Sequence, residues 1–228
     1  MTPRASRVYL YALLSGPPVC EAGVGVCAEP LRVVAVAGLV ALVGDVAEPP
    51  APTAITLRAQ DTVLRRLSAG IDAILPARFG TLVENDMALA EALDRRRPEL
   101  ARALDRVAGC EQMTLRVWGE CAAVAPRFES AGGGPGTRYL AGRRRLHERA
   151  HRVPELGPLR QRLGDLVREE RAERHDRPPL LATVQHLVER GAGGRYVDEV
   201  HAAREAVAPW RVSVSGPWLP YAFGEGAA

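Results

Sequence analysis

Val8-Tyr9-Leu10-Tyr11-Ala12-Leu13 (residues 8–13) is a short apolar segment rich in aromatic residues, and Ser15-Gly16-Pro17-Pro18 follows it closely. These features predict a buried first strand. Two further apolar runs, Leu31–Val36 and Leu39–Val43, are separated only by Ala37-Gly38. A two-residue connection that contains glycine is typical of a tight hairpin, so we expect these two strands to pair.

The remainder of the first half, up to residue 111, is predicted to supply one more strand and the helices that cover the sheet. The expected strand is Ala73–Phe79, in which Pro76 indicates an edge position or a bulge. Apolar residues at helical spacing predict a helix between Leu57 and Gly70. A second helical region starts at the capping residues Asn85 and Asp86, is reopened by Pro98 and ends at Gly109. Together these elements predict an α/β domain with a helix-covered mixed sheet.

The second half, residues 112–228, alternates predicted strands and helices. The expected strands are Thr114–Trp118, Leu180–Val188 and Trp210–Val214, and the expected helices are Tyr139–Arg152, Pro158–His175 and Val197–Val207. The first two helices form a predicted arm over about residues 137–177, after a glycine-rich hinge at 132–136. Because Arg168–Asp176 is polar apart from Ala172, we expect that part of the arm to project into solvent. The alternation indicates a ferredoxin-like α+β domain.

The composition is that of an ordinary globular protein. The 228 residues are 47% hydrophobic and 25% charged, which fits one large domain or two small ones. All basic residues are arginine. Residues 137–177 carry a net charge of +5, whereas the whole chain carries +3, so the positive charge is concentrated in this stretch. The apolar runs 8–14 and 33–43 are too short to cross a bilayer, and the first lacks a cleavage site for export. We therefore expect neither a membrane span nor a signal peptide.

The four cysteines form no metal-binding knuckle. Cys20 and Cys27 are separated by six residues, and Cys110 and Cys121 by ten, so no Cys-x-x-Cys pair occurs. Reduced thiols are the simplest interpretation, although pairing of Cys20 with Cys27 stays open.

His147-Glu148-Arg149-Ala150-His151 has the H-E-x-x-H spacing of zinc peptidases. On a helix, this spacing places two imidazoles on one face to bind the metal, and the glutamate then acts as general base. Five arginines surround the pair, and so many guanidinium groups make a dication site costly. Glu169, Glu170 and Glu173 are candidate third ligands. A zinc-dependent hydrolase is thus the alternative hypothesis, and a solvated helix face is the favoured interpretation.

Other chemistries receive less support from the sequence. Arg143-Arg144-Arg145 forms a basic cluster, but only Tyr139 supplies an aromatic side chain near it, so we expect no nucleic-acid partner. The chain contains no lysine, which excludes a P-loop. No catalytic, cofactor-binding or metal-binding residue is therefore assigned.

Two segments carry more constraints than packing requires. Residues 75–81 read Leu-Pro-Ala-Arg-Phe-Gly-Thr, and residues 215–224 combine three aromatic residues with two prolines. The second segment is a preordered tail that either packs on the protein itself or contacts a partner. The candidates for partner binding or tail docking are Pro76, Arg78, Phe79, Gly80, Gly216, Pro217, Trp218, Pro220, Tyr221 and Phe223.

At these segments the sequence resembles the GvpF/GvpL family of gas vesicle accessory proteins. The matching pieces follow the family's order along nearly the whole chain: Arg7–Tyr11, Leu31–Val46, Ile74–Leu82, Gly136–Leu140 and Gly216–Phe223. The most specific part is the combination of residues 75–81 with the Gly-Pro-Trp tail.

The resemblance implies an N-terminal α/β domain (1–111) and a C-terminal ferredoxin-like domain (112–228), with the aromatic tail (215–228) packed back on the first. It implies no enzymatic activity and no cofactor. The implied function is gas vesicle assembly in the cytoplasm, as a minor structural or chaperone-like component. The implied partners are the small hydrophobic shell protein and other gas vesicle accessory proteins, with no membrane partner.

Overall fold

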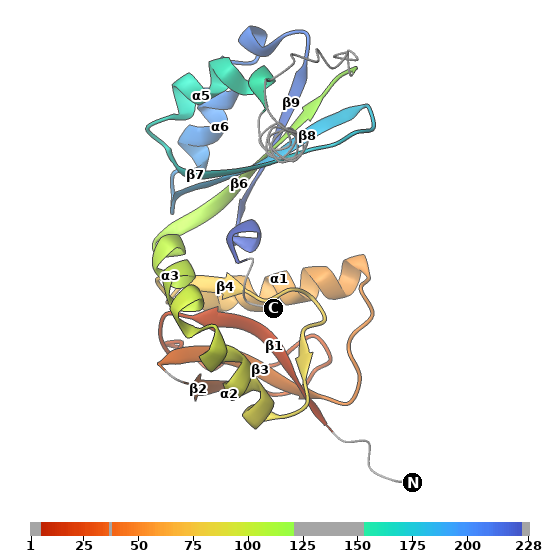
Figure 1. Cartoon of the computed structure of the whole chain (residues 1–228), viewed down its shortest axis with the longest axis vertical. Coiled ribbons are helices and arrows are strands. Elements are labelled where there is room, and N and C mark those ends of the chain that lie inside the picture. The colour runs from red at the N-terminus through yellow and green to blue at the C-terminus, as the bar shows by residue number, and fades with distance from the viewer. Residues whose placement is uncertain (1–5, 37, 121–152, 225–228) are drawn as a thin grey trace, which may run out of the picture. The chain divides into compact units, whose positions relative to one another are not determined.

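The computed structural model describes residues 6–36, 38–120 and 153–224 (Figure 1). The chain divides into two compact units, one formed by Met1–Glu111 with Trp218–Ala228 and the other by Gln112–Pro217. Each unit combines a β-sheet with α-helices, so the fold is mixed α+β.

The first unit contains a five-stranded sheet and three α-helices. Its elements are β1 (Arg7–Leu14), β2 (Leu31–Val36), β3 (Leu39–Val46), α1 (Ala54–Ser68), β4 (Ile74–Pro76), β5 (Leu82–Val83), α2 (Asp86–Arg95) and α3 (Arg97–Val107). The strand order is β2-β3-β1-β4, and β5 also pairs with β1. Strand β1 therefore lies inside the sheet.

Strand β1 is buried on both faces from Val8 to Leu14, which explains why its sequence is almost uniformly apolar. On one face, Tyr9 and Tyr11 pack in a cluster with Val63, Leu64 and Leu67 of α1. The strand is irregular between Leu10 and Ala12, where its register with β3 shifts. The buried first strand predicted from residues 8–13 is confirmed.

Local signals also predicted the hairpin and the start of α2 correctly. Strands β2 and β3 pair antiparallel around Gly38, whose φ of 80° is left-handed. Asn85 caps α2 by accepting a hydrogen bond from the amide of Ala88 at 2.9 Å. Pro76 ends the short strand β4, at the edge that its sequence indicated.

The prediction of a mixed sheet in the first unit is wrong. Strand β1 pairs antiparallel with β3, β4 and β5, and β2 pairs antiparallel with β3. The connection through α1 returns the chain to the other side of β1 in the antiparallel direction, so the strands described in this unit form no parallel pair.

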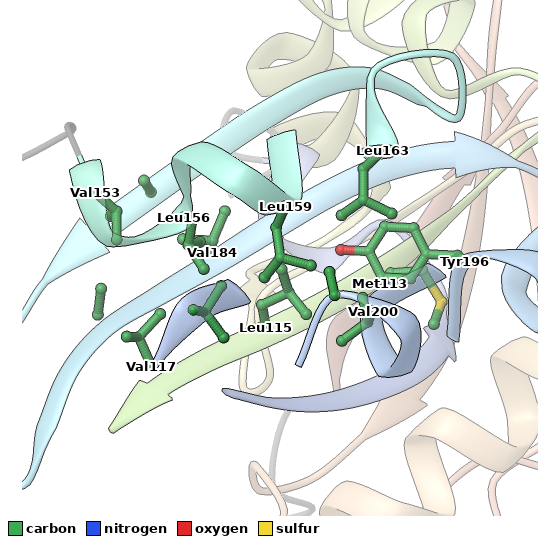
Figure 2. Close-up of a cluster of buried hydrophobic side chains, with 14 of the residues drawn as sticks. Met113, Leu115, Val117, Val153, Leu156, Leu159, Leu163, Val184, Tyr196 and Val200 are labelled. Atoms are coloured by element: carbon green, nitrogen blue, oxygen red, sulfur yellow. The ribbon is translucent and has the colours of Figure 1, made fainter. Parts of the chain in front are cut away.

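The second unit contains a four-stranded sheet in the order β7-β8-β6-β9. Its elements are β6 (Cys110–Trp118), the 3₁₀ turn η1 (Pro154–Leu156), α5 (Gly157–Leu163), β7 (Val167–Arg174), β8 (Leu180–Glu189), α6 (Gly193–Ala202), η2 (Glu205–Val207) and β9 (Arg211–Trp218). Figure 2 shows the core: Leu159 and Leu163 of α5 and Val200 of α6 pack with Met113 and Leu115 of β6.

The predicted helical arm is wrong over residues 167–174, which form strand β7. This strand pairs antiparallel with β8. Two of its charged side chains form ion pairs with the preceding elements: Arg160 contacts Glu170 at 2.7 Å, and Arg174 contacts Glu155 at 3.0 Å. The expected solvent-exposed helix is therefore a sheet edge whose charges meet partners on α5 and η1.

Other parts of the arm prediction, the hinge at 132–136 and the helix at Tyr139–Arg152, lie outside the described residues. Within the described ranges, no helix combines the length and hydrophobicity that crossing a bilayer requires.

A buried polar group sits between the sheet and the helices of the second unit. His186 is 1% exposed; its Nε2 lies 2.9 Å from Glu170 and its Nδ1 lies 2.6 Å from the Tyr196 hydroxyl. Burial by itself would raise the pKa of Glu170, but hydrogen bonds from His186 and Arg160 lower it to about 2. The ionised carboxylate is thus favoured by the folded state.

We predict that Glu170→Gln destabilises the protein at neutral pH by about 2 kcal/mol, because the folded state has a lower pKa at this carboxyl than the unfolded chain. In the wild type, this contribution is present above the unfolded pKa of 4.5 and is lost as the pH falls towards 2. Urea unfolding over a pH series measures the effect.

The matched control is Glu173→Gln, which removes an exposed carboxylate from the same strand. The difference in unfolding free energy between wild type and Glu170→Gln should shrink under acid conditions, and the control should follow wild type. A difference that does not vary with pH would contradict this assignment.

Candidate functional site

The first unit contains a cavity of about 780 Å³, which we call the tail pocket. Three segments far apart in the sequence line it: α1, the end of β4 with the residues that follow, and the C-terminal segment. The lining residues are Leu57, Arg58, Gln60, Asp61, Pro76, Ala77, Arg78, Phe79, Trp218, Tyr221 and Gly224. The two segments singled out by sequence therefore meet at one site.

Tyr9 of β1 holds the loop that follows β4 in place. The Tyr9 hydroxyl donates to Gln60 Oε1 at 2.6 Å and accepts from the amide of Gly80 at 3.0 Å. Its ring meets Phe79 edge-on, with centroids 6.3 Å apart. Gly80 has a φ of 86°, a conformation that strains other residues. One buried tyrosine thus holds both α1 and the loop against the sheet.

The tail is anchored by two apolar side chains. Phe223 is fully buried, and Leu219 is 9% exposed within the cluster formed by α1 and β1. The 3₁₀ turn η3 (Tyr221–Phe223) packs against β4. At Gly224, an added Cβ would lie 3.1 Å from the Pro76 carbonyl oxygen, so the tail approaches β4 closely there.

Hydrogen bonds and a cation–π contact connect the tail to α1. Asp61 accepts hydrogen bonds from Arg65 Nε at 2.6 Å and from the Tyr221 hydroxyl at 2.9 Å. The Arg65 guanidinium also lies over the Trp218 ring, 5.3 Å from its centroid. Burial, and next the charge of Asp61, raise the pKa of Tyr221, so its hydroxyl stays protonated and donates.

The pocket has the chemistry of a binding surface. Its apolar side chains reach solvent, since Leu57 is 46%, Trp218 38% and Tyr221 36% exposed. Exposed aromatic and aliphatic side chains around a hollow are typical of a site that buries a ligand or partner. Asp61 accepts hydrogen bonds from Arg65 and Tyr221, so its carboxylate stabilises the fold of the site.

The H-E-x-x-H segment, His147–His151, lies outside the described residues. Of its candidate third ligands, Glu170 is engaged by Arg160 and His186. In the part of the chain that the structure describes, no three His, Cys, Asp or Glu residues are grouped as metal ligands would be. Cys20 and Cys27 are free thiols.

Not all candidate residues take part in the pocket. Pro76, Arg78, Phe79, Trp218 and Tyr221 line it. Gly80, Pro220 and Phe223 support it, the last two by burial. Gly216 and Pro217 do not line it and belong to the second unit.

The sequence did not predict that residues of α1 line the pocket. Leu57 lies seven residues before the buried Leu64 and so looks like a core position, yet it is half-exposed at the pocket. Arg58 and Asp61 look like ordinary surface residues of an amphipathic helix. The i, i+4 spacing of Asp61 and Arg65 was the one available signal, and it predicts only a helix ion pair.

We predict that Phe223→Ala releases the tail, because removing a fully buried phenylalanine costs about 3 kcal/mol. Limited digestion with chymotrypsin should then cleave at Trp218 faster than in wild type. Tyr221→Phe is the control, since it removes only one partly exposed hydrogen bond worth about 1 kcal/mol. Equal cleavage of Phe223→Ala and wild type would show that the tail is not held by this contact.

Comparison with known proteins gives consistent matches along the chain. A family model described as "Gas vesicle synthesis protein GvpL/GvpF" matches residues 7–225. Gas vesicle protein F of Streptomyces sp. (strain CB03234) is 31% identical over 244 residues, covering 97% of this chain and 100% of that protein. Gas vesicle protein L of the same organism is 28% identical over 253 residues, covering 97% and 93%.

Solved structures share the fold. The crystal structure of the gas vesicle protein GvpF from Anabaena sp. PCC7120 has a TM-score of 0.72 at 16% identity, covering 96% of both chains. That of GvpF from Microcystis aeruginosa has a TM-score of 0.71 at 15% identity, covering 96% of this chain and 98% of that one. The resemblance stated from the sequence motifs is confirmed, and the chain belongs to the GvpL/GvpF family of gas vesicle synthesis proteins.

Proposed function

We propose that this protein assists gas vesicle assembly by binding the hydrophobic shell protein, as a minor structural or chaperone-like component without enzymatic activity. Membership of the GvpL/GvpF family supports the assembly role. The proposal also places the protein with the gas vesicle in the cytoplasm, where other gas vesicle accessory proteins are further partners.

The observation that carries the binding role is the tail pocket, with its half-exposed Leu57, Trp218 and Tyr221. A subunit that walls off gas presents a large apolar face, which promotes aggregation before assembly. An apolar pocket on a charged protein can cover part of that face and release it later. Trp and Tyr are also the residue types that contribute most to protein–protein binding.

The topology of the second unit supports two further parts of the proposal. In the second unit, the element order β6-α5-β7-β8-α6-β9 with the strand order β7-β8-β6-β9 fits a ferredoxin-like domain. We assign it to the C-terminal half, with a domain boundary near residues 111 and 112. The C-terminal tail is then the part of this half that returns to the N-terminal domain.

We predict that Leu57→Asp lowers recovery of the shell protein at least about tenfold when the two proteins are co-expressed and co-purified, since a charge in the pocket opposes apolar contact. Leu57 is half-exposed, so this change leaves the core intact. Quantitative mass spectrometry of the purified complex measures the recovery.

The matched control is Met87→Asp on α2, which changes a side chain that is 69% exposed and lies outside the pocket. It should recover as much shell protein as wild type. If the wild-type protein recovers no shell protein, and vesicles form normally in cells that lack it, the proposed function is wrong.

A further inference from the structure

Two arginines line the tail pocket beside its apolar surface. Arg58 projects from α1 and Arg78 from the loop after β4, and both are exposed. Among the residues that the structure describes, neither guanidinium forms an ion pair or a hydrogen bond. The pocket therefore presents two cationic groups that its own surroundings leave available.

The one acidic lining residue does not neutralise them. Both oxygens of Asp61 are used, one by Arg65 and the other by Tyr221. Arg65 is in turn occupied by Asp61 and by the Trp218 ring. The remaining charge of the pocket is therefore positive, and it borders an apolar floor that includes Phe79.

This combination selects for the chemistry of its occupant. An apolar side chain gains free energy by entering the pocket, and a nearby carboxylate gains by pairing with a guanidinium fork. A purely apolar ligand would form no ion pair with the two arginines, and a purely acidic ligand would leave the apolar lining of the pocket exposed to solvent. Electrostatic complementarity of this type mainly sets specificity and the rate of association.

The surface around the pocket favours a polypeptide over a small amphiphile. Exposed apolar side chains reach the pocket from two separate segments, Leu57 from α1 and Trp218 and Tyr221 from the C-terminal segment. Tryptophan, tyrosine and arginine, which are enriched at the centres of protein interfaces, all line the site. A single acyl chain would cover only part of this surface.

We infer that the tail pocket binds a segment of another gas vesicle protein in which an aliphatic or aromatic side chain lies within a few residues of a carboxylate. The apolar side chain enters the pocket, and the carboxylate pairs with Arg58 and Arg78. This inference rests on the proposed function and specifies which part of a partner the site recognises.

The test uses the full-length protein and short synthetic peptides tiled along the shell protein and along the accessory proteins of the same gene set. Each peptide is also made with its Asp and Glu residues replaced by Asn and Gln. Fluorescence anisotropy measures binding to wild type and to the double variant Arg58→Glu/Arg78→Glu. Binding peptides should contain a carboxylate, and either the amide form or the double variant should weaken binding at least about tenfold.

Arg195→Glu/Arg204→Glu is the matched control, because it makes the same change in net charge at two exposed arginines of the second unit. It should bind like wild type. Arg58→Gln/Arg78→Gln, with circular dichroism of every variant, separates loss of pairing from charge repulsion or misfolding, and it should also weaken binding.

Three results would overturn the inference. One is equal affinity for the acidic and amide peptides. Another is peptide binding that the two pocket variants leave unchanged. The last is that dodecanoate binds at the pocket while no peptide does. In each case, recovery of intact shell protein by the wild type would leave the proposed function standing, so the two failures are distinguishable.

Discussion

Burial of Leu219 and Phe223 on the first unit is the contact on which the candidate site depends. The chain enters the second unit between Glu111 and Gln112 and leaves it between Pro217 and Trp218. Without the two apolar anchors, Trp218 and Tyr221 would not stand beside α1. The pocket is therefore a product of tertiary packing between segments far apart in the sequence, as the hydrogen bond from Tyr221 to Asp61, 160 residues away, illustrates.

Much of the fold could be predicted because its signals are local. The hairpin at Gly38, the cap at Asn85 and the edge position of Pro76 each follow from the conformational preferences of one residue. Strand β7 could not be predicted in this way. Its residues alternate weakly and are mostly charged, so they fit an exposed helix as well as a strand. They form a strand by pairing with β8, and Arg160 and Glu155 neutralise Glu170 and Arg174 only once the fold has formed.

The site shows the same division between local and distant information. Residues 75–81 and the aromatic tail were recognisable because proline, glycine and clustered aromatic residues impose demands that simple packing does not. The part played by α1 was hidden, because Leu57 continues the apolar periodicity of a core helix. A sequence pattern shows which face of a helix is apolar, but it does not show where the covering layer ends. Here Leu57 remains half-exposed beside the pocket.

The central claim is that this protein meets its gas vesicle partner at the pocket completed by its own tail. Hydrogen exchange of the wild-type protein, alone and in complex with the shell protein, tests it most directly. The account predicts that slowed exchange is concentrated in residues 54–62, 77–81 and 218–224, whereas the exposed start of α2 exchanges as in the free protein. Slowed exchange that spares these three segments and appears elsewhere in the chain would contradict it.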